Sequence, residues 1–206
     1  MKNAALIRLR PQRENLPKWR QTAKTGQQAM NHNDSISFLY EQFEESCFSL
    51  FEGLECAVNF AEKPEAGTEG SFIAMIDAGS NDVELRLFLR MPFSVLALTY
   101  PIPDIIDIEE EKLEDWMAEL SNMLIGKIKA KLLKYDIQVK IGIPESFYDV
   151  DIDAIAPEGF ESKTYYFDID SVIVEGRIYV DLLVDELDLQ KLADDDETDE
   201  GELEMF

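Results

Sequence analysis

The sequence predicts an α+β fold with one mainly antiparallel sheet and two long helices packed on one face of it. Two long segments, residues 34–57 and about 109–134, repeat apolar residues at spacings of three and four, as amphipathic helices do. Each is followed by shorter apolar runs separated by turn-forming residues, which is typical of strands. The order of helix, two strands, helix and strands favours a two-layer arrangement.

Composition places the chain among globular proteins. It has 206 residues, of which 46% are apolar and 10% aromatic, enough for one domain with a hydrophobic core. No apolar run approaches the ~18 residues that cross a bilayer. The first thirty residues lack the hydrophobic stretch of a secretory signal, so we expect a cytoplasmic protein.

Charge divides the chain into three parts. The net charge is −24, yet residues 1–29 carry seven basic side chains and one acidic, which leaves 12 basic and 42 acidic for residues 30–206. We expect a flexible basic extension over 1–29, a domain over 30–190 and an acidic tail over 191–206. Met30 as the true start, or a binding role for the basic segment, are the alternatives. An acidic body repels nucleic acid and anionic membranes, so neither is an expected partner.

The first helix is expected to start at Asp34 or Ser35, either of which can cap it. Gly53 weakens its last turn. Its aromatic residues are expected to be mostly core. The apolar stripe consists of Ile36, Leu39, Phe43, Cys47, Leu50, Phe51 and Leu54.

The strands are predicted from alternation and from turn residues. Residues 72–77 and 83–89 form a hairpin around 78–82, and residues 92–100 form a short helix. After the second helix, the remaining segments are a strand at 138–143 stopped by Pro144, an irregular stretch at 145–162, and strands at 164–168 and 172–184 with a turn or bulge at Glu175-Gly176.

The second helix carries the constellation with chemical potential. Its first turn is acidic and its end is rich in lysine, which suits the helix dipole. Its apolar stripe leaves Glu119 and Asn122 on the opposite, solvent side, three residues apart and therefore adjacent. Asp115 and Gly126 share that face, and Gly126 leaves room for another protein's backbone to approach.

Other catalytic chemistry has little support. His32 is the single histidine, and the two cysteines, Cys47 and Cys56, fall in or beside the first helix, where buried thiols are favoured over a disulfide. A zinc site or a histidine base is therefore not expected. The repeat Asp149-x-Asp151-x-Asp153 resembles the start of a calcium loop, but it lacks the later Gly and Glu, so we interpret it as a solvated loop.

The helix motif resembles that of the CheC/CheX/FliY family of chemotaxis phosphatases. In that family a Glu-x-x-Asn signature on an exposed helix is followed by apolar residues and a Gly, as in Glu119-Leu-Ser-Asn122-Met-Leu-Ile-Gly126. The resemblance spans about residues 34–186. The first helix has no Glu-x-x-Asn, which makes the chain similar to CheX, with one site per subunit.

The resemblance implies a phosphatase function, with roles for named residues. The substrate would be the phospho-aspartate of a CheY-like response regulator. Asn122 would orient the attacking water, and Glu119 would pair with the regulator's lysine. Positioning then supplies the catalysis, with no cofactor or metal of the chain's own and with Mg²⁺ brought by the regulator. CheX-type proteins are homodimers, so a dimer is implied.

Two other functions stay open from the residues. A non-catalytic regulator-binding or scaffold module on the same fold would use the same face without hydrolysis. A metal-dependent hydrolase would need a carboxylate cluster that the sequence does not offer. The sequence names neither the regulator nor the pathway.

Overall fold

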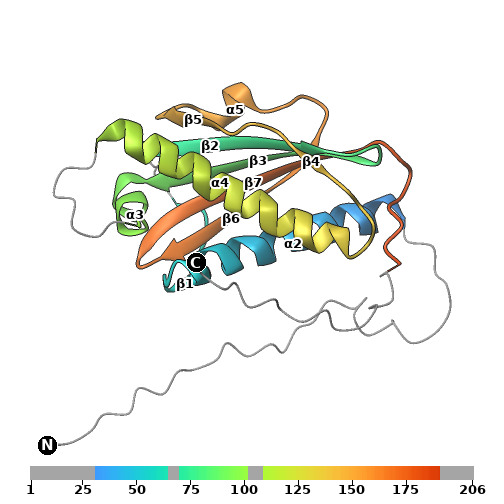
Figure 1. Ribbon diagram of the computed structural model, residues 1–206, viewed down its shortest axis with the longest axis horizontal. Helices are drawn as coiled ribbons and strands as arrows, with labels where there is room; N and C mark the ends of the chain where they lie inside the picture. The colour runs from blue at the N-terminus through green and yellow to red at the C-terminus, as the bar shows by residue number, and fades with distance from the viewer. Residues whose placement is uncertain (1–30, 65–69, 102–108, 191–206) are drawn as a thin grey trace, which may run out of the picture.

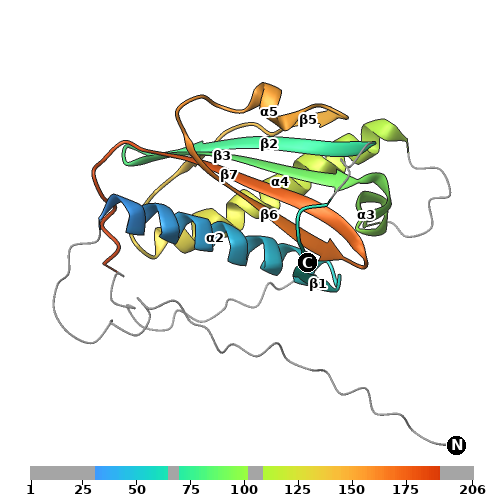
Figure 2. The same cartoon turned by 180° about the vertical axis from the view of Figure 1, so that it is seen from behind.

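The computed structural model describes residues 31–64, 70–101 and 109–190. The predicted basic extension and acidic tail lie outside this part of the chain. The described residues form an α+β fold with a seven-stranded sheet and two long helices, as the sequence predicted (Figures 1 and 2).

The helices and strands lie close to their predicted bounds, with additions. The helices are α2 (His32–Gly53), α3 (Phe93–Leu98), α4 (Glu110–Leu133) and α5 (Ile152–Ile155). The strands are β1 (Val58–Phe60), β2 (Ser71–Gly79), β3 (Val83–Pro92), β4 (Lys140–Ile141), β5 (Glu145–Tyr148), β6 (Glu161–Ile169) and β7 (Val172–Leu182).

The sheet is antiparallel at every strand pair described. Its order is β1-β6-β7-β3-β2-β4, and β5 also pairs with β2 on the same edge as β4. Two hairpins, β2–β3 and β6–β7, meet at the β3–β7 pair in the middle of the sheet. Each outer edge is made of short strands, β1 on one side and β4 with β5 on the other.

One hydrophobic core lies between the sheet and the helices α2 and α4 (Figure 1). Alternate residues of β2, β3 and β7 point into it, as the period of two in a strand requires. Gly176 of β7 lies under α2, where an added Cβ would come within 3.1 Å of the Phe43 ring. Any side chain there would require the Phe43 ring to shift by a few tenths of an ångström.

A smaller cluster covers the other face of the sheet. Ile152 of α5 is buried against Ile73, Phe88 and Tyr179 from three neighbouring strands. Arg177 of β7 binds Asp153 of α5 and the buried Glu175, and Arg90 donates to the Val150 carbonyl at 3.0 Å. These contacts hold α5 on the face that the long helices do not cover.

Three sequence expectations are corrected. The stretch 145–162 is not irregular, because it contains β5 and α5. Glu175-Gly176 is neither a turn nor a bulge, since both residues pair in register with Arg90 and Leu89. The strand expected at 138–143 shortens to two residues, because Gly142 donates its N–H to the Asp77 carbonyl outside the ladder and Pro144 follows.

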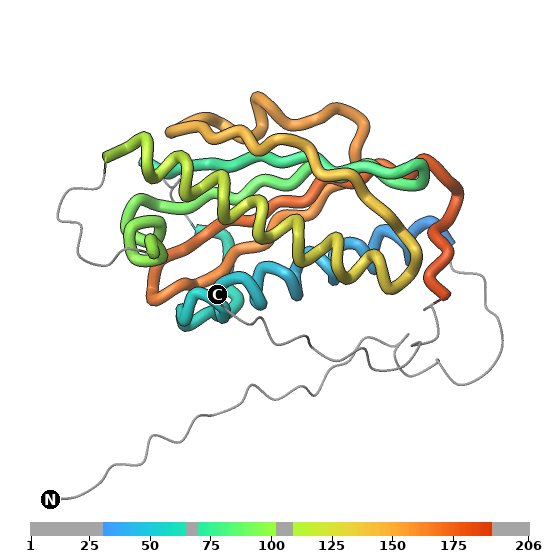
Figure 3. The backbone as a smooth tube through the Cα atoms, in the orientation of Figure 1, coloured from blue at the N-terminus to red at the C-terminus, as the bar shows by residue number. Residues whose placement is uncertain are grey.

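The end of the described chain returns to its beginning. After β7, the Leu187 N–H donates to the Ser35 hydroxyl of α2 at 2.9 Å, so the last described residues lie beside the first turn of that helix (Figure 3). Asn31 caps α2 by accepting from the Asp34 N–H, and the Asp34 carboxylate accepts in return from the Asn31 N–H. Helix α2 therefore starts two residues before the predicted position.

Candidate functional site

Helix α4 is a continuous 24-residue helix with one buried side. Spacings of three, four and seven keep the apolar positions in one stripe along the helix. The buried residues are Leu113, Met117, Leu120, Ser121, Leu124, Ile125, Ile128 and Leu132. The remaining positions of the helix face solvent or its neighbouring elements.

The four predicted site residues share the side of α4 away from the core. Asp115 and Glu119 are exposed, and Asn122 and Gly126 are partly exposed. Asn122 is therefore not sealed beneath other side chains. A Cβ added at Gly126 would find no atom within 4 Å outside the helix backbone, so the ridge beyond Asn122 is low and open.

The side chains of Glu119 and Asn122 are not engaged elsewhere. Within the described ranges 31–64, 70–101 and 109–190, neither has a hydrogen-bond or ion-pair partner in the folded chain. A carboxylate and a carboxamide are thus presented side by side to solvent. The amide can donate and accept at once, and the carboxylate can accept from a cation.

Contacts on both flanks hold α4 in place. Lys127 donates to the Ser49 hydroxyl of α2 at 3.1 Å, and Lys131 bonds Glu45 of the same helix at 3.2 Å. On the other flank, the Ser146 hydroxyl of β5 donates to the Glu114 carbonyl at 3.0 Å. A rigid helix is a good support for side chains that must be positioned within a fraction of an ångström.

The N-terminal half of α4 is also tied to α3. The Trp116 indole N–H donates to the Thr99 hydroxyl at 3.2 Å, and the Trp116 ring packs edge-on against Tyr100 at 6.1 Å between centroids. Trp116 therefore joins the helix to the segment that follows α3, although the sequence pattern only marked it as apolar.

The equivalent chemistry is not available on α2. Its Glu44 lies against Tyr165 and Lys163, and burial raises the pKa of that carboxyl. Burial likewise raises the pKa of the Cys47 thiol, whereas Cys56 is partly exposed; both cysteines are free. Nothing on α2 repeats the open pair of α4.

Metal chemistry finds no support in the described residues. No three His, Cys, Asp or Glu side chains in that part of the chain are grouped so as to hold an ion. Asp151 instead caps α5 by accepting from the Asp153 N–H at 3.0 Å, and Asp149 accepts from the Gly70 N–H at 3.2 Å. The Asp149-x-Asp151-x-Asp153 repeat therefore has local structural roles.

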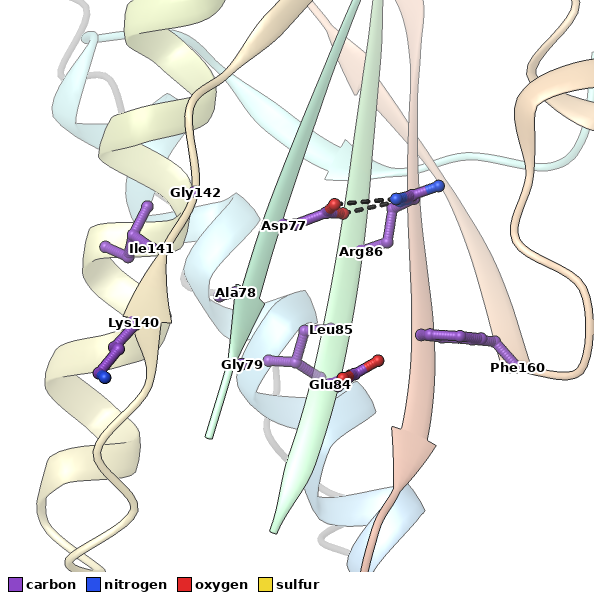
Figure 4. A pocket seen from close by; sticks show the side chains of 10 residues that line it. All are labelled: Asp77, Ala78, Gly79, Glu84, Leu85, Arg86, Lys140, Ile141, Gly142 and Phe160. Atoms are coloured by element: carbon purple, nitrogen blue, oxygen red, sulfur yellow. Dashed lines mark hydrogen bonds and ion pairs between the residues drawn. The ribbon is translucent and has the colours of Figure 1, made fainter. Parts of the chain in front are cut away.

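A pocket of about 380 Å³ lies away from the predicted site, on the outer side of the β2–β3 hairpin (Figure 4). Arg86 donates two hydrogen bonds to Asp77, at 2.7 and 2.8 Å, and Phe160 points toward them from the loop after α5. None of its lining residues belongs to α4. Sequence analysis did not anticipate it, although Asp77 and Arg86 stand directly opposite each other in the hairpin.

The geometry of α4 suits a large partner better than a small substrate. The pair stands on a convex helix, outside the pocket described above, so a small molecule would find no enclosure there. A partner that brings its own reactive group in its own cavity would need only a protruding amide and carboxylate.

A protein-family model matches the part of the chain that contains the candidate site. The family model described as "Chemotaxis phosphatase CheX" matches residues 73–168, a span that contains all of α4 with Glu119 and Asn122. The chain is CheX-like. The resemblance predicted from the helix motif is thereby confirmed over residues 73–168, a part of the predicted span 34–186.

Solved structures share the fold of this CheX-like chain. A chain of the CheX-CheY-BeF3-Mg²⁺ complex from Borrelia burgdorferi has 18% identity and a TM-score of 0.55, and the match covers 69% of this chain and 97% of that one. CheX from Vibrio vulnificus has 13% identity and a TM-score of 0.59, with 69% and 96% covered. CheX from Desulfovibrio desulfuricans has 12% identity and a TM-score of 0.52, with 70% and 98% covered.

A search of curated proteins finds no match to this chain.

Among its described helices, none combines the length and the apolar character required to span a bilayer.

Proposed function

We propose that this protein is a phosphatase that removes the phosphoryl group from the phospho-aspartate of a CheY-like response regulator. The observation that carries the proposal is the open, unpartnered Glu119/Asn122 pair on the rigid outer side of α4. The CheX family match and the likeness to a chain from a CheX–CheY complex support the choice of partner.

In this mechanism the chain only positions the attacking water and the regulator. Asn122 would enter the regulator's phosphorylation site, and its amide would hold a water in line with the phosphorus–oxygen bond. Glu119 would pair with a lysine of the regulator and fix the docking. The acyl phosphate is already reactive, and a hundredfold acceleration needs about 2.7 kcal/mol, which one well-placed amide can supply.

The regulator would bring the metal ion that the reaction needs. The protein would have no cofactor of its own, and the regulator would supply Mg²⁺ beside its phospho-aspartate. Asp115 and Gly126 would line the docking face. A cytoplasmic location fits such a substrate. Nucleic acid and membrane surfaces are not proposed as partners, given the net charge of −24.

The decisive experiment follows phosphate loss from a phosphorylated CheY-type regulator with Mg²⁺ present. The wild-type protein should accelerate the loss, and Asn122→Ala should reduce the acceleration at least tenfold while leaving the unfolding temperature unchanged. Asn33→Ala is the matched control, since Asn33 is an exposed asparagine in a helix outside the site. Equal rates for wild type and Asn122→Ala, with binding retained, would replace catalysis by a non-catalytic regulator-binding role.

A homodimer is the proposed assembly. The β4–β5 edge of the sheet leaves Ile143 87% exposed and Ile141 36% exposed, an apolar surface beside unpaired strand backbone. Light scattering should give twice the chain mass for the wild type and a lower mass for Ile143→Asp. A single-chain mass for the wild type at micromolar concentration would contradict the dimer.

A further inference from the structure

The outer side of α2 is acidic along its whole length. The helix carries Asp34, Glu41, Glu44, Glu45 and Glu52 and has no lysine or arginine. Helix α4, in contrast, has three lysines in its last seven residues, and its C-cap residue is Lys134. The two long helices therefore present opposite charge toward their C-terminal ends.

An aromatic surface lies at the far end of α2. Phe60 of the edge strand β1 is 57% exposed, and its ring lies edge-on to that of Phe48 at 4.7 Å between centroids. Phe167 of β6 supports both rings from below, at 5.5 and 6.1 Å. The exposed Phe60 ring, backed by the partly buried Phe48 and the buried Phe167, forms a surface that can accept an apolar or aromatic side chain.

The helix position of Phe48 is informative. The buried residues of the two helices superimpose with a shift of 74 positions: Leu39, Phe43, Ser46, Cys47, Leu50 and Phe51 match Leu113, Met117, Leu120, Ser121, Leu124 and Ile125. With that shift Phe48 takes the position of Asn122, and Glu52 takes that of Gly126. The helix side that offers an amide and an open ridge on α4 offers an aromatic ring and a carboxylate on α2.

A segment of the same chain has the complementary chemistry. Residues 1–29 carry a balance of +6 and the apolar side chains Leu6, Ile7, Leu9 and Trp19, and they join the described chain directly before α2. Helix α2 has five acidic residues, of which Glu45 is already paired with Lys131, so the segment and the helix carry opposite charge. Both features favour attraction between the segment and the helix.

Chain length permits the contact. Trp19 is 12 residues before Asn31, so the connecting chain spans at most about 40 Å. Phe48 lies 17 residues after Asn31 in a helix that rises 1.5 Å per residue, which places it about 25 Å from the cap. The connecting chain is therefore long enough for Trp19 to reach the aromatic pair.

We propose that the basic segment 1–29 binds along the acidic side of α2, with Trp19 on the aromatic pair Phe48 and Phe60. The contact would cover the exposed Phe60 ring within the same chain. The proposal does not depend on the phosphatase function, because it involves neither Glu119 nor Asn122.

The test uses the full chain labelled with 5-fluorotryptophan. The chain has two tryptophans, so ¹⁹F NMR gives two signals, which a Trp19→Phe variant assigns. The Trp19 signal should differ from that of a synthetic peptide of residues 1–29, and Phe60→Ser should shift it to the peptide value. Trp116, packed against Thr99 and Tyr100, reports in the same spectrum that the fold is intact.

Charge is tested with matched variants. Glu52→Lys on α2, combined with Glu55→Lys at the exposed Glu55 two residues after that helix, should move the Trp19 signal toward the peptide value, as should 0.5 M salt. Glu84→Lys with Glu158→Lys makes the same charge change on exposed residues of other elements and should leave the signal in place. Phe93→Ser removes a different phenylalanine, 53% exposed on α3, and should likewise have no effect.

Three results would overturn the proposal. A Trp19 signal identical to that of the free peptide would mean that the segment does not bind. A signal that responds to salt but not to Phe60→Ser would remove the aromatic pair from the contact. A signal that depends on protein concentration would assign the surface to a second copy of the chain instead.

Discussion

Tyr40 and Tyr165 show how single side chains between α2 and β6 respond to burial. The Tyr165 hydroxyl donates to the Tyr40 carbonyl at 3.0 Å, and Lys163 lies over both rings. Burial, with a smaller contribution from the negative charge of Glu161, raises the pKa of Tyr40 to about 12. Burial also raises the pKa of Tyr165.

These shifts predict alkaline sensitivity. An unfolded tyrosine loses its proton near pH 10, and the folded Tyr40 does so only near pH 12, so the unfolded state releases protons first. The contribution of Tyr40 to the free energy of unfolding should be constant below pH 10 and fall as the pH rises from 10 to 12. Urea titrations should show a shallower fall for Tyr40→Phe with Tyr165→Phe. The exposed Tyr148→Phe is the control, and an unchanged slope in the double variant would contradict the assignment.

At the scale of elements, α4 is firmly packed although it contains a glycine, which lowers the stability of a helix. Its buried stripe and flanking bonds hold it firmly, yet Gly126 in its interior lowers helix propensity by up to about 1 kcal/mol relative to alanine. The open space at Gly126 shows that folding does not require a glycine there. Access for a partner is the physical reason that the proposed docking face supplies.

Substitution of Gly126 separates its effect on the stability of α4 from its effect on access for a partner. Gly126→Ala and Gly126→Leu should both leave the free energy of unfolding unchanged or raised by up to about 1 kcal/mol, because nothing collides with the new side chain. Regulator dephosphorylation should fall for Leu and much less for Ala. Thermal unfolding and the phosphatase assay measure the two effects, and full activity in Gly126→Leu would exclude Gly126 from the docking face.

At the scale of the whole molecule, one sheet serves two hydrophobic clusters of unequal size. The long helices cover one face, and α5 covers part of the other through Ile152 and the bonds of Arg177 and Arg90. Because β2, β3 and β7 contribute to both clusters, loss of either should weaken the same sheet.

Truncation of Ile152 tests this coupling. Ile152 is fully buried, so Ile152→Ala should lower the free energy of unfolding by about 2–5 kcal/mol. Unfolding followed by far-UV circular dichroism and by tryptophan fluorescence should remain one transition at one denaturant concentration. The partly buried Ile155→Ala on the same helix should cost less. A separate early transition would mean that α5 and its cluster form an independent unit.

Local patterns predicted the long elements and missed some short ones. The two long helices, the β2–β3 hairpin, the strands β6 and β7, and α3 follow from periodicity and turn residues, which act within a few positions of the chain. Strand β1 was not predicted, because Val58–Phe60 is three residues long and gains its structure from pairing with Phe167–Ile169, more than one hundred residues away. The same holds for β5, which pairs with Phe72–Met75.

Some features of the candidate site could be predicted from the sequence and others could not. The positions of Glu119, Asn122 and Gly126 on one side of α4 follow from 100° per residue. The flanking bonds from Lys127 and Ser146 that hold the helix could not be predicted, since their partners come from elements distant in sequence. The function of the pair stays a prediction that the phosphatase assay tests.

By itself, the sequence determined the class of fold, the two amphipathic helices and the side of α4 on which the site residues stand, because periodicity is a local property of the chain. The tertiary structure alone decided which sheet edge β1, β4 and β5 join, where the pocket beside Arg86 lies, and that Phe60 remains exposed. Those features depend on contacts between segments that are far apart in the sequence. No local sequence pattern encodes such contacts, because they are formed only when the chain packs.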